Sequence, residues 1–197
     1  AFDPATSVMI STLSANAAQT FKTKARNALG IETSESASTM TYTAAIYPAL
    51  LSTGSISQIS ATSFTVTWDK NGNSDLTQYY AWVTTGVLSS NSDWGTFFSR
   101  NFTSLIPNTS YYAYARARNQ NGIDSYWNFL GSTRTLAATP QSVASTFTAV
   151  TLTTISFQWS SNNNPVGTLY MADISSDAGF ALIAASSQSV LTQVLFN

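Results

Sequence analysis

The feature of this sequence that most limits its fold is an internal repeat of about 92 residues. Trp68 and Trp159 lie 91 residues apart, and each ends a short run in which apolar and polar residues alternate. A second match, with a spacing of 92, relates Ala25-Arg26-Asn27 to Ala117-Arg118-Asn119. Two independent stretches thus agree on one repeating unit, whose length is that of a small β-sandwich domain.

The local pattern within the repeat is that of short β-strands. Residues 63–68 read Ser-Phe-Thr-Val-Thr-Trp and residues 154–159 read Thr-Ile-Ser-Phe-Gln-Trp. In a strand, this period of two places the apolar side chains on one buried face and the polar ones on the opposite face. Turn residues separate such runs, which indicates an antiparallel sandwich or barrel. One competing helical stretch, residues 178–185, is short and adjoins strand-like sequence, so we predict an all-β chain.

The repeat divides the chain into a half, a whole and a half. Residues 1–47 match only the second half of the unit, residues 48–139 form one whole unit, and residues 140–197 match only the first half. We therefore expect one complete sandwich with a partial sandwich at each end of the chain.

The whole unit resembles a fibronectin type III domain. The residues that carry the resemblance are Trp68, Tyr79, Leu105, Pro107 and Tyr111, followed by alternating alanines at 113, 115 and 117. The third unit repeats the first two of these residues as Trp159 and Tyr170. The resemblance implies tandem antiparallel sandwiches in which strands A, B and E form one sheet and strands C, C′, F and G form the other. Residues 1–47 would then supply strands E to G, and residues 140–197 strands A to C′.

The resemblance also implies a tyrosine corner, in which the Tyr111 hydroxyl ties the turn between strands E and F to the backbone. The first unit departs from this pattern, because Gln19 stands where the whole unit has Tyr111. We therefore expect the first half-domain to be less rigid or to be braced in another way.

Composition excludes several classes of function. The chain has neither His nor Cys, which removes Ser-His-Asp and Cys-His catalytic groups, zinc sites built from those residues, and disulfides. Charged residues make up only 9% of the chain and the net charge is −1, so a basic surface for nucleic acid or anionic membrane is absent. No apolar run approaches the roughly 20 residues of a membrane span, and no signal peptide is visible.

The carboxylates suggest neither a catalytic pair nor a metal site. Residues 69–75 place oxygens at alternate positions, as in a calcium loop, but Gly72 comes two positions too early for an EF-hand. Tyr80 also stands where the bidentate Glu of that loop belongs, so an Asn/Gly-rich turn explains the segment better. We expect no enzyme activity, no cofactor and no bound metal.

Outward-facing residues of strands C and F form the candidate interaction site. If Tyr79 and Tyr111 point inward with every second residue of their strands, the residues between them point outward. These outward residues form an exposed stripe on the two adjacent strands. Its members are Tyr80, Trp82, Tyr112, Tyr114, Arg116 and Arg118. These residue types are enriched at interface hot spots, which favours a contact surface. The alternative is cross-strand pairing and arginine stacking that only stiffen the sheet.

Partial sandwiches would expose an apolar face and unpaired strand edges, which recruit other strands. One hypothesis is that the C-terminal half of one chain is completed by the N-terminal half of the next, so that copies join head to tail into a filament. The other is that adjacent repeats of a longer tandem array complete both halves. Both indicate a structural protein that is extracellular or at the cell surface, and the absence of Cys favours a microbial source. The alternative function is adhesion, in which the aromatic stripe binds a polysaccharide or a host protein.

Overall fold

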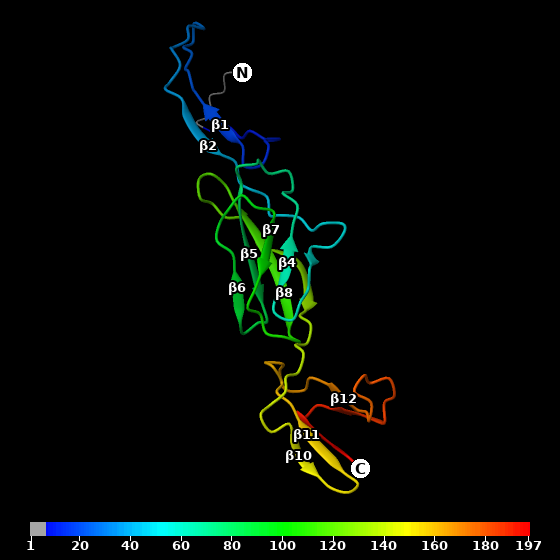
Figure 1. The fold of residues 1–197 in the computed structure, drawn as a ribbon. Helices are drawn as coiled ribbons and strands as arrows, with labels where there is room; N and C mark the ends of the chain where they lie inside the picture. Colours follow the sequence, from blue (N-terminus) through cyan, green and yellow to red (C-terminus); the bar gives the residue numbers. More distant parts are fainter. Residues whose placement is uncertain (1–6) are drawn as a thin grey trace. The chain divides into compact units, whose positions relative to one another are not determined.

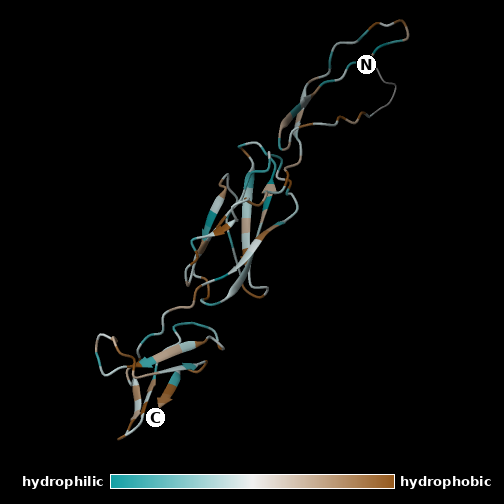
Figure 2. Ribbon diagram, turned by 90° about the vertical axis from the view of Figure 1, so that its right-hand side faces the viewer, coloured by the Kyte–Doolittle hydropathy of each residue, from teal (hydrophilic) through white to brown (hydrophobic). Residues whose placement is uncertain are grey.

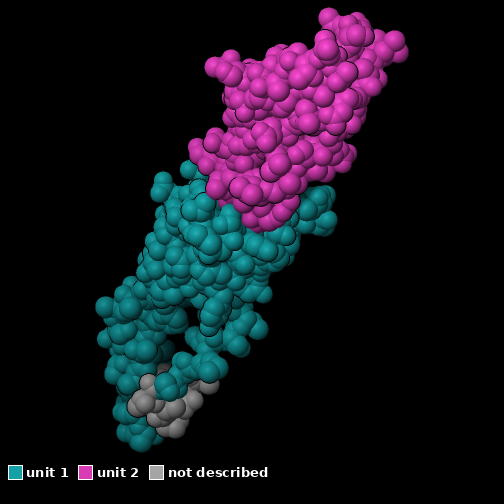
Figure 3. Space-filling model, turned by 90° about the horizontal axis from the view of Figure 1, so that it is seen from below, with its two compact units in different colours: residues 1–57, 65–100, 112–132 teal, residues 58–64, 101–111, 133–197 magenta. Residues whose placement is uncertain are grey.

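The computed structural model describes residues 7–197, which form fourteen β-strands and no helix. Figure 1 labels many of these strands, numbered in chain order. The chain divides into two compact units, coloured in Figure 3. The first comprises residues 1–57, 65–100 and 112–132, and the second comprises residues 58–64, 101–111 and 133–197. Each unit therefore combines one end of the chain with part of its centre.

Seven strands lie in the segment that the sequence predicts as a complete sandwich. They are β3 (Ile56–Ser57), β4 (Phe64–Thr67), β5 (Gln78–Thr84), β6 (Ser89–Asn91), β7 (Ser99–Phe102), β8 (Ser110–Arg118) and β9 (Asn128–Arg134). One sheet has the order β3-β4-β7 and the other has the order β6-β5-β8-β9. These are the A-B-E and C′-C-F-G orders that the resemblance implies, and the predicted all-β fold class is confirmed.

The alternation read in the sequence produces the core of these sheets. In β8, Tyr111 and the alanines at 113, 115 and 117 are buried, while every intervening side chain is exposed or half-buried. Trp68 packs against Tyr79 and Phe97, with ring centroids 6.1 and 6.0 Å apart respectively. In the second compact unit, Phe64 packs in the same way against Phe102 and Tyr111. The Tyr111 hydroxyl accepts a hydrogen bond of 3.0 Å from the backbone N–H of Ile106, as a tyrosine corner requires.

The N-terminal segment contains two paired antiparallel strands, β1 (Ala18–Phe21) and β2 (Thr39–Tyr42). Their surroundings repeat those of β8 and β9 at the spacing of 92 residues. The N–H of Ala17 donates to Thr43 Oγ1 at 2.9 Å, and the N–H of Thr109 donates to Thr135 Oγ1 at 3.0 Å. The pair β1-β2 thus occupies the F and G positions of the first, partial repeating unit.

The C-terminal segment contains five strands in two sheets. They are β10 (Phe147–Val150), β11 (Ile155–Gln158), β12 (Tyr170–Ile174), β13 (Ala185–Ser189) and β14 (Gln193–Phe196). The sheet orders are β10-β11-β14 and β12-β13. By comparison with the central strands, these are the A-B-E and C-C′ positions.

The E position is therefore filled from the C-terminal segment, and not from residues 1–47 as the resemblance implied. Residues 7–47 form only β1 and β2, and residues 1–6 lie outside the described part of the chain. The reason is the alternation within β14, where Val194 and Phe196 are buried and the ring of Phe196 stacks on Phe157 with centroids 5.8 Å apart. Figure 2 shows hydrophobic residues, in brown, along this strand beside the C-terminus.

Candidate functional site

The predicted aromatic stripe lies across β5 and β8, which are neighbouring strands. Their register places Tyr80 opposite Arg116 and Trp82 opposite Tyr114, whose rings lie 5.4 Å apart between centroids. Of the stripe residues only Tyr112 is exposed, and the other five are half-buried.

Two tryptophans that the sequence analysis did not single out cover the stripe. The ring centroid of Trp127 lies 5.9 Å from that of Tyr80 and 5.7 Å from that of Trp82. The ring of Trp94 lies 5.3 Å from that of Tyr80. This cover explains why Tyr80 and Trp82 are half-buried rather than exposed. Neither tryptophan lies in a strand, so no alternation pattern marked it.

The two arginines of the stripe are held by rings and by one carboxylate. The guanidinium carbon of Arg116 lies 4.6 Å from the ring centroid of Trp127, and that of Arg118 lies 3.8 Å from that of Trp94. Asp124 accepts from both arginines, at 2.9 Å from Arg116 Nη1 and 2.7 Å from Arg118 Nε. Stacked and ion-paired arginines of this kind stiffen a sheet. The part of the surface left for a ligand consists of the exposed rings of Tyr112, Trp127 and Phe129.

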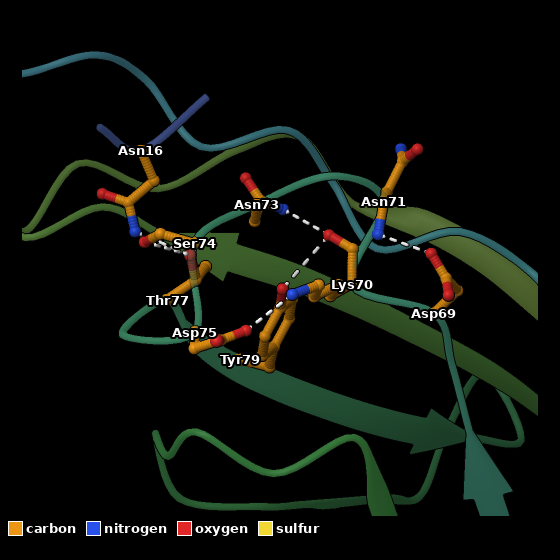
Figure 4. A network of polar contacts seen from close by, with 9 residues as sticks. All are labelled: Asn16, Asp69, Lys70, Asn71, Asn73, Ser74, Asp75, Thr77 and Tyr79. Atoms are coloured by element: carbon orange, nitrogen blue, oxygen red, sulfur yellow. Dashed lines mark hydrogen bonds and ion pairs between the residues drawn. The ribbon is translucent and has the colours of Figure 1, made fainter. Parts of the chain in front are cut away.

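The loop at residues 69–75, which resembles a calcium loop, is closed by its own side chains (Figure 4). The backbone N–H of Asn71 donates to Asp69 Oδ1 at 2.7 Å, and Lys70 Nζ lies 2.6 Å from Asp75 Oδ1. The Lys70 ammonium group holds the pKa of Asp75 below its ordinary value. Across residues 7–197, no three acidic side chains gather closely enough to hold a metal ion.

The buried asparagine of this loop binds the segment that leads into the repeat. Asn73 Oδ1 accepts from the N–H of Ile46 at 2.9 Å, and its Nδ2 donates to the Ile46 carbonyl at 2.7 Å. The next unit repeats both bonds between Asn164 and Ala138, at 2.8 and 2.7 Å. Because an asparagine amide can both donate and accept, it satisfies both backbone groups of one residue.

A second side-chain pair also recurs where one repeating unit follows another. Asn16 Nδ2 donates to Thr77 Oγ1 at 2.7 Å, and Asn108 Nδ2 donates to Thr168 Oγ1 at 2.9 Å. We call these contacts, together with those of Asn73 and Asn164, the asparagine junctions. The sequence analysis missed them, although the spacings of 91 and 92 residues relate every one of these positions to its counterpart.

The C-terminal segment leaves its core half open. Trp68 is 1% exposed and Phe64 is fully buried, whereas their counterparts Trp159 and Ile155 are only half-buried. A cavity of about 350 Å³ is lined mainly by apolar side chains, among them Phe147, Phe157, Ile174 and Phe180. Within the described residues β12 pairs with β13 alone, whereas its counterpart β5 pairs with both β6 and β8.

Residues 51–128 match the family model of the fibronectin type III domain. The chain contains a fibronectin type III domain. A segment of two fibronectin type III domains from chicken tenascin superposes with a TM-score of 0.52 at 12% identity, covering 76% of this chain and 81% of that one. The extracellular domains d3–d4 of rat CD45 give 0.44 at 15% identity, over 68% and 72% of the two chains. The FN5 domain of Drosophila Lar gives 0.36 at 20% identity, over 46% and 96%. At these identities the likeness concerns the fold alone, and a search of curated proteins found no match by sequence.

Fibronectin type III domains are commonly extracellular structural or adhesion modules, and they are generally not enzymes. The fold alone does not fix one activity, so the function must be argued from the surfaces described above. No helix in residues 7–197 is long and apolar enough to cross a membrane.

Proposed function

We propose that this chain is an extracellular structural protein whose copies join head to tail into a filament. The C-terminal half-domain of one copy is completed by β1 and β2 of the next copy. One observation carries the proposal: the C-terminal strands occupy the A, B, C, C′ and E positions, and β1 and β2 occupy F and G. The two sets overlap at no position and together make the seven strands of one domain.

The open core of the C-terminal segment supports the same proposal. Three of the side chains that line its cavity, Ile155, Phe157 and Ile174, have counterparts in the central domain that are sealed from water, namely Phe64, Val66 and Val83. Burial of such apolar surface is the main favourable contribution to association. A strand added at the edge of β12 would also pair backbone groups that have no strand partner in the described residues.

The asparagine junctions support a mechanical role. They recur at both places where one repeating unit follows another, and the buried side chains of Asn73 and Asn164 satisfy the connecting backbone. Such bonds resist local opening because an unsatisfied buried polar group is costly. A second copy that completes the last domain would thus join a chain already braced at each junction.

Electron microscopy of the purified full chain and of two variants of Lys22 tests the proposal. The N–H of Thr23 donates to Ser36 Oγ, and the Thr23 carbonyl accepts from the N–H of Ser36. Because successive residues of an extended chain point their backbone groups to opposite sides, the N–H of Lys22 faces away from β2, toward the open edge that continues β1. Lys22→Pro removes that N–H without removing a bond between β1 and β2, while Lys22→Ala keeps it.

We expect filaments from the wild type and from Lys22→Ala, and shortened or no filaments from Lys22→Pro. Monomers of the wild-type chain would overturn the proposal in favour of completion by adjacent repeats of a longer chain. If Lys22→Pro formed filaments as long as those of the wild type, strand addition at this edge would be overturned.

The adhesive function remains the second candidate, and the exposure of Tyr112 and Phe129 favours it. Both residues are 45% exposed, and their ring centroids lie 6.5 Å apart on the outer face of the sheet. Exposed aromatic faces of this kind bind sugar rings or protein side chains. The double variant Tyr112→Ala/Phe129→Ala tests this function. If it no longer captures a polysaccharide or a host protein but still assembles, adhesion is supported. Loss of assembly with no ligand found would support the structural role.

A further inference from the structure

We infer the register in which the end of β1 and the residues after it, up to Ala25, add to β12 of another copy: Phe21 lies opposite Ile174, and Lys22 lies opposite Asp173. The inference rests on the proposed function, because it assumes that the second copy supplies the missing F strand. It goes further in naming which residues meet, on which face, and what fixes their alignment.

The register follows from the complete domain and from the two repeat spacings. There, β5 and β8 pair antiparallel, with Val83 opposite Ala113 and Ala81 opposite Ala115. Adding 91 to the residue numbers of β5 gives the positions of β12. Subtracting 92 from the residue numbers of β8 gives residues 18–26, which begin with β1. The inward pairs of the composite sheet are then Phe21 with Ile174, Thr23 with Ala172, and Ala25 with Tyr170.

The inward face explains a difference in side-chain size between the two units. Phe21 stands where the complete domain has Ala113, and it is 39% exposed in the single chain. Opposite it, Ile174 lines the cavity of about 350 Å³ in the C-terminal half. A phenyl ring suits a cavity of this kind better than a methyl group does. A slip of one residue would instead turn Lys22 toward the apolar side chains, which is a costly arrangement.

The outward face adds charge complementarity at the same register. Lys22 and Asp173 take the positions that Tyr114 and Trp82 hold in the complete domain, where the two rings pack together. Opposite charges on directly opposed strand positions attract each other. Lys22 already lies 3.1 Å from Glu35, and Asp173 accepts a hydrogen bond of 2.6 Å from Ser186. Both contacts lie at the surface, so the new pair can form beside them or replace them at little cost.

The turn after β1 supplies a further anchor at the same register. In the complete domain, Asn119 accepts from the N–H groups of Asn121 and Ile123, and its Nδ2 donates to the Thr43 carbonyl at 3.1 Å. Asn27 accepts from the N–H groups of Leu29 and Ile31 in the same way. The spacing of 92 therefore places the Asn27 amide of the second copy against the Thr135 carbonyl of the first.

Engineered cysteines test the register, and the natural chain has no cysteine to interfere. In the complete domain, Ala81 exchanges hydrogen bonds with Ser92 on its other side, so its pair with Ala115 is a non-hydrogen-bonded one. Such pairs have Cα atoms about 4.5 Å apart, which suits a disulfide. The equivalent positions are Thr23 and Ala172, where cysteine changes side-chain volume little.

The full chain carrying Thr23→Cys with Ala172→Cys is oxidised and run on a non-reducing gel, with light scattering of the reduced protein alongside. We expect a ladder of covalent oligomers. The matched control is Ala25→Cys with Ala172→Cys, which also faces inward but is displaced by two residues. Its Cα atoms lie about 7–8 Å apart in our register, too far to be bridged without movement, so we expect at least a tenfold lower yield.

The outcomes separate the register from the proposed function. If the reduced proteins form polymers but only the Ala25 pair cross-links, or neither pair does, the register is overturned and the filament stands. If the reduced protein is monomeric and forms no ladder, both are overturned. A disulfide within a single monomer overturns both as well, because it shows that one chain completes its own half-domain.

Discussion

Asn73 and Asn164, which lie 91 residues apart, make the same two hydrogen bonds in successive units. Each amide side chain accepts from and donates to the backbone of a single residue, Ile46 in one unit and Ala138 in the next. Both asparagines are buried. The junction between units is therefore a repeated structural element, and it holds the segment that enters each unit to the loop between strands B and C.

Asn73→Ala should destabilise the chain, because both backbone groups of Ile46 lose their side-chain partner. We expect the free energy of unfolding to fall by about 1–3 kcal/mol, measured by urea denaturation. Asn91→Ala, at an exposed position of β6, is the control and should change stability by less than about 0.5 kcal/mol. Equal effects of the two substitutions would contradict the role of the junction.

Tyr111→Phe should remove the acceptor of the Ile106 N–H while leaving the buried ring in place. We expect a loss of about 1–3 kcal/mol in the free energy of unfolding. Tyr112→Phe alters the exposed neighbouring hydroxyl and should be nearly neutral. A neutral Tyr111→Phe would show that water replaces the corner hydrogen bond without cost.

Arg116→Lys should weaken the aromatic cluster although it conserves the charge. Lysine has no planar guanidinium to stack on Trp127 while it binds Asp124, so we expect a loss of about 0.5–2 kcal/mol in stability. Arg134→Lys, at an exposed position of β9, serves as the control. If both variants unfold at the wild-type urea concentration, the stacking adds nothing to stability.

Glu32 should titrate at a lower pH than an ordinary glutamate. Lys24 and Arg26 donate hydrogen bonds to its carboxylate and hold its pKa below the usual value. The unfolded chain therefore binds this proton more readily than the folded chain does. The stability that Glu32 contributes is present above the unfolded pKa of about 4.3 and is lost as pH falls through the lower folded pKa.

Carbon NMR of the Glu32 side chain during an acid titration measures this pKa directly. Arg26→Gln should move the midpoint upward, since it removes one of the two cationic donors. A wild-type midpoint at or above the value of a free glutamate would contradict the ion pairs seen around this carboxylate.

The strands and their inward faces could be predicted from the sequence because period-two alternation is a local signal. Tyr79 and Tyr111 are buried on adjacent strands as expected. The extent of exposure in the stripe could not be predicted, because it depends on Trp94 and Trp127, which reach the sheet from outside the strands. Asp124 does carry a signal that was missed, because Glu32 lies 92 residues earlier and pairs with Lys24 and Arg26 as Asp124 pairs with Arg116 and Arg118.

The strand in the E position could not be placed because the repeat similarity stops after β12. Phe196 follows Tyr170 by 26 residues, whereas Phe102 follows Tyr79 by 23, so the spacing no longer matches beyond that strand. Only its pairing with β11 identifies β14. The asparagine junctions, in contrast, do carry a sequence signal, since both members of each pair recur at the repeat spacing.

The completion of the C-terminal half-domain by a second copy is tested most directly by sedimentation velocity over a dilution series of the full chain. We predict species much heavier than the single-chain mass of 21.1 kDa at high concentration, shifting toward that mass on dilution. A species of 21.1 kDa at every concentration would contradict completion between copies.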